Sequence, residues 1–182
     1  MSWSDLVTAD PRSGYPALTD RVVLVDALTV ADAQAHWGGE DDEQARSFGW
    51  YPKRSTIEQV RQFLEDTQRQ WREHGSRRSF AIRDATTHTL LGGCETRLQG
   101  DGTAHLSWWV FPEYRGRGIA SRGVCLMILY AVDALSVRTF LVWIEQDNLT
   151  SRGVARHAGF VECGMEEEAS VGRPMLRYER AV

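Results

Sequence analysis

The stretch Arg115-Gly116-Arg117-Gly118-Ile119-Ala120 decides the fold, because it joins a strand-like segment, 104–110, to a strongly apolar helix-like segment, 120–135. Its two glycines let the backbone adopt unusual dihedral angles and approach a ligand closely. At the start of the helix, free N–H groups point toward an anion with the helix dipole behind them. We therefore predict a phosphate or pyrophosphate site, to which Arg115 and Arg117 add positive charge.

This loop does not match the common nucleotide-binding loops. No GK[ST] follows it, as a P-loop requires, and the GxGxxG of a dinucleotide fold is absent. On the motif alone, a glycine-rich strand-to-helix turn with solvated arginines remains the alternative.

Strand and helix patterns follow one another along the rest of the chain. Residues 1–18 read as an extended lead-in, in which Pro11, Gly14 and Pro16 break regular structure. A capping-box pattern at Ser55-Thr56-Ile57-Glu58 opens a long amphipathic helix. Strands are predicted at 21–25, 79–82, 90–98, 104–110 and 138–145, helices at 31–37, 55–75, 120–135 and 148–157, and two more strands in the tail at 166–180. This order predicts one α/β (α+β) domain over residues 1–182.

Composition excludes several classes of protein. Of the 182 residues, 42% are hydrophobic and 25% are charged, as in globular domains. The net charge of −4 argues against nucleic acid as a partner, since phosphate binding needs a positive surface. No apolar run approaches the ~20 residues that span a bilayer, and no secretory signal is visible, so we expect no membrane association and a cytoplasmic location. The three scattered cysteines, Cys94, Cys125 and Cys163, suggest no metal site.

Two motifs resemble those of a known family, and they follow one another in the same order as in that family. Arg115-x-x-Gly118-x-Ala120 resembles the [Q/R]xxGx[G/A] acetyl-CoA signature of the GNAT superfamily of N-acetyltransferases. The block from Asn148 to Phe160 resembles the NxxSxxVxxxxGF block of its RimJ/RimL-like branch. Leu90-Leu91-Gly92-Gly93 resembles the "IGG" strand of that branch. The resemblance implies the GNAT fold, a central mixed, mostly antiparallel sheet flanked by helices, with acetyl-CoA as the acyl donor.

The resemblance also implies a donor site. The backbone amides of the glycine loop would hold the pyrophosphate, and the preceding strand end would pair with the pantetheine arm. The Val110 N–H would stabilise the oxyanion, Asn148 would bind the pantetheine, and Ser151 would protonate the leaving thiolate. Ala155 stands where some relatives carry a tyrosine for that protonation. The implied donor-binding residues are Trp109, Val110, Phe111, Arg115, Gly116, Arg117, Gly118, Ile119, Ala120, Asn148 and Ser151.

A general base must take a proton from the acceptor ammonium before the amine attacks. His105 shares one strand face with Ser107 and Trp109, and this line runs toward the expected thioester. We predict His105 as the base, with Glu95 second and Glu168 third.

The acceptor half of the site is less specific in sequence. Trp50 and Tyr51 lie in a loop that we expect to close over the acceptor, because aromatic rings offer apolar walls and cation–π faces to an amine. The acidic run 39–43 reads as a solvated loop or helix start, or as a rim that attracts cations.

The predicted reaction is acetyl transfer from acetyl-CoA to a primary amine, of a protein N-terminus or a small molecule, by direct attack on the thioester. The alternatives are a non-catalytic acyl-CoA-binding module and an acyltransferase that uses another acyl-CoA. The aromatic content and the loosely matching tail are compatible with a homodimer.

Overall fold

A computed structural model describes residues 7–9, 14–49, 52–168 and 172–182 of the chain. In this part, one sheet of nine strands runs in the order β1-β2-β3-β4-β5-β6-β7-β9-β8. The strands are β1 Val7–Ala9, β2 Pro16–Thr19, β3 Val23–Ala27, β4 Arg77–Asp84, β5 Leu90–Gly100, β6 Thr103–Val110, β7 Thr139–Ile144, β8 Val161–Glu168 and β9 Arg173–Ala181. Neighbouring strands are antiparallel except for β6 and β7, which are parallel. The predicted mixed, mostly antiparallel sheet is therefore confirmed.

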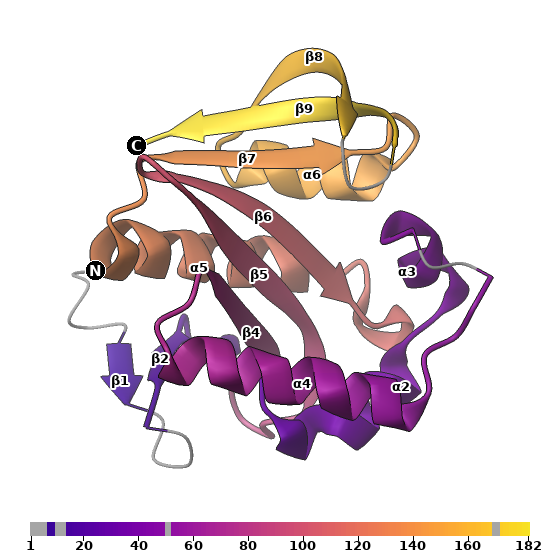
Figure 1. Ribbon diagram of the computed structural model, residues 1–182, viewed down its shortest axis with the longest axis vertical. Helices are drawn as coiled ribbons and strands as arrows, with labels where there is room; N and C mark the ends of the chain where they lie inside the picture. The colour runs from indigo at the N-terminus through magenta and orange to yellow at the C-terminus, as the bar shows by residue number, and fades with distance from the viewer. Residues whose placement is uncertain (1–6, 10–13, 50–51, 169–171) are drawn as a thin grey trace.

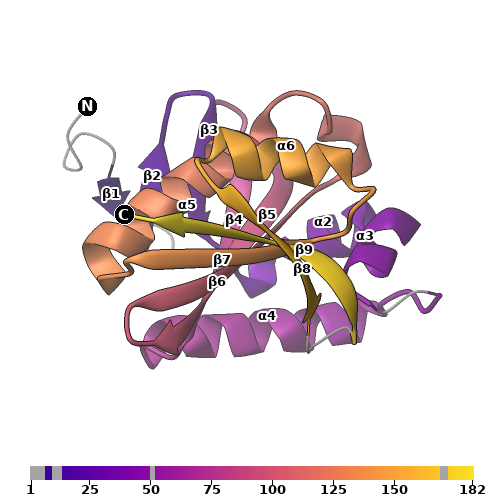
Figure 2. The ribbon, with the colours of Figure 1, turned by 90° about the horizontal axis from the view of Figure 1, so that it is seen from above.

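Helices cover both faces of this sheet (Figures 1 and 2). The α-helices are α2 Ala33–Gly39, α3 Asp42–Ser47, α4 Ile57–Arg72, α5 Ile119–Leu135 and α6 Leu149–His157, and two short 3-10 helices are η1 Val30–Asp32 and η2 Pro112–Tyr114. Seen from above, α4 and α2 lie on one side of the strands, and α5 and α6 lie on the other (Figure 2). The helix-flanked sheet is the architecture that the sequence predicts.

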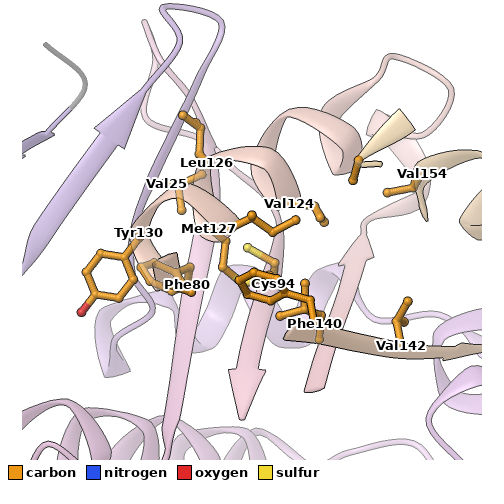
Figure 3. Close-up of a cluster of buried hydrophobic side chains, with 14 of the residues drawn as sticks. Val25, Phe80, Cys94, Val124, Leu126, Met127, Tyr130, Phe140, Val142 and Val154 are labelled. Atoms are coloured by element: carbon orange, nitrogen blue, oxygen red, sulfur yellow. The ribbon is translucent and has the colours of Figure 1, made fainter. Parts of the chain in front are cut away.

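The larger hydrophobic core lies between α5 and the sheet (Figure 3). Val124 and Met127 of α5 pack toward Phe80, Cys94 and Phe140, all fully buried. Gly123 allows this approach, because a Cβ there would lie 2.3 Å from Cδ1 of Ile82. A second, smaller cluster, centred on Leu28, Leu64 and Phe111, fills the opposite face beneath α4. The sheet is thus held rigidly from both sides.

Two local predictions need correction, and the interpretation of the acidic run as a helix start is confirmed. Pro16 does not end regular structure but begins β2, a position where the missing N–H of proline is tolerated. The capping box of α4 uses Thr56 and Gln59 rather than Ser55 and Glu58. Both pairs fit the same pattern one residue apart, so sequence cannot choose between them. The acidic run ends in the short helix α3, which Asp41 caps by accepting from the N–H of Gln44 at 2.8 Å.

No helix in the described part of the chain is long and apolar enough to cross a membrane.

Candidate functional site

A cleft opens where β6 and β7 part. The two strands pair only from Thr103↔Thr139 to His105↔Leu141 and then diverge (Figure 1). Beyond the last pair lies a cavity of about 340 Å³. Its walls are the diverging strand ends, 106–110 and 142–145, together with Arg115, Gly116, Ala120, Asn148, Thr150 and Ser151. Most of the predicted donor-binding residues therefore lie around one cavity.

The glycine loop stands at this cleft, between η2 and α5. Gly116 and Gly118 both have φ +73°, a region that residues with a Cβ adopt at a cost. A Cβ at either position would meet no atom within 4 Å, so the glycines serve the backbone conformation rather than packing. The 17-residue helix α5 begins directly after Gly118. Its first N–H groups have no partner within the helix, which is the geometry that the predicted anion site requires.

Arg115 does not present a free charge to that anion site. Its Nη1 lies 2.8 Å from Asp41 Oδ2 and 2.7 Å from Glu43 Oε2, and its Nε donates to the Val110 carbonyl at 2.9 Å. Two carboxylates thus neutralise the guanidinium, which ties the glycine loop to the start of α3. Arg117 instead lies over the Tyr114 ring, 6.0 Å from its centroid. Of the two arginines, only Arg117 has no carboxylate partner among the described residues.

The predicted residues of the second motif occupy the opposite wall. Asn148 caps α6 by accepting from the Ser151 N–H at 2.9 Å, which is the local role that its position favours. Both residues also line the cleft. Ala155, at the place where some relatives carry a tyrosine, is fully buried.

A second cavity of about 240 Å³ lies on the sheet face beneath α2 and α4. It is lined by His36, Glu40, Gln44, Phe48, Ser55, Gln59, Val60, Phe63, Glu95, Arg97, Ser107 and Trp109. Four of these residues, Gln44, Phe48, Ser107 and Trp109, also line the first cleft. The two cavities are therefore adjacent at β6, and we call their shared border, lined by Ser107 and Trp109, the junction.

Glu95, and not His105, borders this junction. In the pairing of β5 with β6, Glu95 lies opposite Ser107, and Arg97 lies opposite His105. Glu95 is 4% exposed, lines the second cavity, and accepts from Ser79 Oγ and Arg97 Nε, each at 2.6 Å. Its carboxylate is held in place by these two donors.

His105 lies at the end of the parallel pairing, where its ring packs on Trp143 at 4.6 Å between centroids. It lines neither cavity. Burial lowers the pKa of His105, against the opposing effect of Glu168, and Arg97 lowers it further. The geometry thus favours the second sequence candidate, Glu95, over the first.

His36 lines the second cavity, a position that the sequence did not reveal. It is 5% exposed, and its ring contacts those of Phe63, Trp109 and Phe111. Burial lowers its pKa to about 4, although Asp32 opposes the shift, so the imidazole is neutral near pH 7. A lone histidine in an amphipathic helix carries no sequence signal that separates a core residue from a ligand-binding one.

Three of the seven buried side-chain polar atoms without a partner in the described part of the chain belong to residues that line the second cavity. Among the described residues, His36 Nδ1, Gln44 Oε1 and Trp109 Nε1 lack any hydrogen bond, and all three residues line this cavity. Unpartnered buried polar groups are rare, because each loses the hydrogen bonds it made with water. These three atoms could accept or donate hydrogen bonds to a ligand in this cavity.

The sequence candidates for the acceptor loop, Trp50 and Tyr51, lie outside the described residues. Trp37, which neighbours that loop in the sequence, is 42% exposed and donates to the Ser55 carbonyl at 2.9 Å. It lines neither cavity.

Comparison with known families decides the assignment. The acetyltransferase (GNAT) domain model matches residues 21–161. The chain belongs to this family. The predicted GNAT membership is confirmed, and with it an acetyltransferase that takes acetyl-CoA as its donor. No curated protein matches the chain by sequence.

Solved structures share the fold at low sequence identity. The ribosomal-protein-S5-alanine acetyltransferase of Vibrio fischeri has a TM-score of 0.76 and 19% identity, over 91% of this chain and 96% of its own. RimL, the ribosomal L7/L12 alpha-N-protein acetyltransferase in complex with coenzyme A, has a TM-score of 0.78 and 15% identity, over 97% and 98%. The microcin C7 self-immunity acetyltransferase MccE, in complex with acetyl-CoA and AMP, has a TM-score of 0.76 and 17% identity, over 90% and 94%. The neighbours thus include the RimJ/RimL-like type that the sequence resembles.

Proposed function

We propose that this GNAT enzyme transfers the acetyl group of acetyl-CoA to a primary amine, with the donor in the cleft between β6 and β7 and the acceptor in the cavity beneath α2 and α4. The observation that carries the proposal is the junction of the two cavities at Ser107 and Trp109. A thioester in one cavity and an amine in the other meet there without a covalent enzyme intermediate. Positioning of this kind supplies much of the rate of a bimolecular reaction.

Backbone groups at the cleft suit the donor. The Phe111 N–H donates to the Leu91 carbonyl on β5, at 2.9 Å. Because backbone groups alternate along a strand, the Val110 N–H points the other way, toward the diverging β7. The pantetheine arm would pair with this free edge, and the Val110 N–H would donate to the thioester oxygen as it becomes an oxyanion. The amides from Gly116 to Ala120, together with Arg117, would hold the pyrophosphate.

Proton transfer is assigned to Glu95 in this proposal. The amine nitrogen attacks the thioester carbon after its proton passes to Glu95, directly or through water. The C–S bond of the tetrahedral intermediate then breaks. The CoA thiolate leaves and receives, relayed through Ser151 or through water, the second proton that the attacking nitrogen gives up as the amide forms. Protein N-terminal amines and small-molecule amines are both acceptors of the required chemistry, and the names of two structural neighbours favour the former.

The test couples donor binding to turnover. Acetyl-CoA should raise the melting temperature by mass action, and CoA release should follow when peptides with free N-termini or small amines are added. Glu95→Gln keeps the size of the side chain and should lower kcat about 100- to 10,000-fold with acetyl-CoA affinity unchanged. His105→Ala is the matched comparison and should stay within a few-fold of the parent protein.

A larger loss in His105→Ala than in Glu95→Gln would return the base to His105. Acetyl-CoA binding without turnover of any amine would favour a non-catalytic module, and turnover only with a different acyl-CoA would change the donor.

A further inference from the structure

One carboxyl group in the wall of the acceptor cavity, the one beneath α2 and α4, differs from the other in its partners. Its ionisable lining residues are Glu40, Glu95, Arg97 and the neutral His36. Arg97 Nε is bound to Glu95 at 2.6 Å, and Arg77 Nε lies 3.7 Å from the same carboxyl group, so the charge of Glu95 is offset. Among the described residues, Glu40 has no lysine or arginine partner. Glu40 is therefore the carboxylate of the cavity lining that has no cationic partner in the described part of the chain.

Glu40 is held in the wall rather than in solvent. Its side chain is 11% exposed, and its Oε1 lies 3.6 Å from Nε2 of His36. Burial raises the pKa of the Glu40 carboxyl, and a hydrogen bond from Ser55 opposes the shift. A carboxylate removed from water in this way gains most from a cation that takes the place of the lost solvent.

His36 supplies an independent sign of a ligand at the same wall. Its side chain is 7% exposed, and its Nδ1 has no hydrogen-bond partner in the described part of the protein. A proton on Nε2 faces Glu40 and leaves the Nδ1 lone pair to accept from an N–H group of a ligand. Phe48, Phe63 and Trp109 line the same cavity and offer aromatic faces that attract a cation.

We propose that the acceptor carries a second cationic group besides the amine that is acetylated, and that Glu40 binds this group while His36 accepts a hydrogen bond from the ligand. This inference rests on the proposed function and narrows its substrate class to diamines and to peptide N-termini followed by a basic residue. A volume of about 240 Å³ suits a short aliphatic chain or the first side chains of a peptide. Glu40 then selects among amines, while Glu95 serves the reacting one.

The experiment uses acceptor pairs in which one member carries a second ammonium group, with kcat/KM counted per acetylated amine. Putrescine is compared with aminobutanol, in which a hydroxyl replaces one ammonium, and seryl-lysinamide is compared with seryl-norleucinamide. The parent protein should favour the dicationic member of at least one pair by about 10- to 100-fold in kcat/KM, the range expected of a hydrogen-bonded charge pair away from solvent. Which pair responds distinguishes a small diamine from a peptide terminus. Calorimetric titration of the same pairs onto CoA-loaded protein measures the preference without turnover.

Glu40→Gln removes the charge with the side-chain shape kept, and it should reduce the preference to about threefold or less. Asp42→Asn is the matched control. It removes one charge two residues away, where Asp42 pairs with the exposed Arg54 and lines neither cavity. It should keep the full preference.

Two outcomes overturn the inference: equal kcat/KM and equal affinity within both pairs, or a preference that survives Glu40→Gln. Turnover of both members at equal rates would leave the acetyltransferase proposal standing while removing this one. A Glu40-dependent preference in calorimetry without turnover would support the cation site and count against the proposed function.

Discussion

Acid should destabilise this protein in a way that depends on His36. The folded state holds the pKa of His36 at about 4, against an ordinary value of 6.5. Between these two values the unfolded chain binds more protons than the folded one, so stability rises with pH. The contribution of the neutral imidazole is fully present above about pH 6.5 and is lost as the pH falls toward 4. Its full size is about 3 kcal/mol, and about 2 kcal/mol of it disappears between pH 7 and pH 5.

The assay is urea unfolding at a series of pH values. His36→Phe removes the titrating group and keeps a ring among Phe63, Trp109 and Phe111. Because carboxylates also titrate in this range, the informative quantity is the difference between the parent protein and the variant. Between pH 7 and pH 5 the parent protein should lose about 2 kcal/mol more than His36→Phe. His157→Gln removes an exposed imidazole and should follow the parent curve.

Parallel curves for the parent protein and His36→Phe would refute the reasoning. They would mean that the imidazole accepts a proton without cost in the folded state, either because it becomes exposed or because Asp32 and Glu40 stabilise its cation.

Two further predictions concern the glycine loop and the buried ion pairs. Gly118→Val forces a β-branched residue to φ +73° at the start of α5. It should weaken acetyl-CoA binding at least about tenfold, as measured by calorimetry. The control Gly153→Val, at a glycine without positive φ, should bind acetyl-CoA normally. Affinity retained in Gly118→Val would contradict the anion site. Arg83→Met leaves the buried carboxylates of Asp26 and Asp32 without the guanidinium that both contact at 2.8–2.9 Å, and should cost about 3–5 kcal/mol in urea unfolding. Arg122→Met breaks the more exposed pair with Asp20 and should cost less than about 1 kcal/mol of stability. Equal losses of stability in the two variants would show that burial does not strengthen the ion pairs of Arg83.

The sequence predicted the parts of the fold that rest on local patterns. The helix after Gly118 and the strand before it appear where the apolar spacing put them, as α5 and β6. The tail was predicted as two strands over 166–180 with a turn near Gly172 and Pro174. The two strands are present as β8 and β9, but β8 begins earlier, at Val161, and Pro174 lies within β9. Periodicity of side chains and positive φ at glycine are properties of short segments, so one sequence suffices to read them.

Local sequence patterns could not predict contacts between segments that are far apart in the sequence. The helix α3 has only six residues, too few to be stable alone. Its N-cap residue, Asp41, forms an ion pair with Arg115, 74 positions away in the sequence, and this contact stabilises it. His36 and Glu95 face one cavity because α2 packs against β5, and no spacing in the chain records that packing. The prediction of His105 as the base followed strand alternation correctly, but alternation does not say where β7 leaves β6.

The acidic run, residues 39–43, contacts both the glycine loop and the acceptor cavity. Its sequence alone therefore could not predict either contact. Asp41 and Glu43 hold Arg115 of the glycine loop, while Glu40, one residue earlier, faces the acceptor cavity. A run of carboxylates in sequence is usually solvated because like charges repel. Here the guanidinium of Arg115 offsets the charges of Asp41 and Glu43. Glu40 is the carboxylate without a cation among the described residues. The same few residues thus anchor the loop proposed for the donor and supply the charge proposed for acceptor choice.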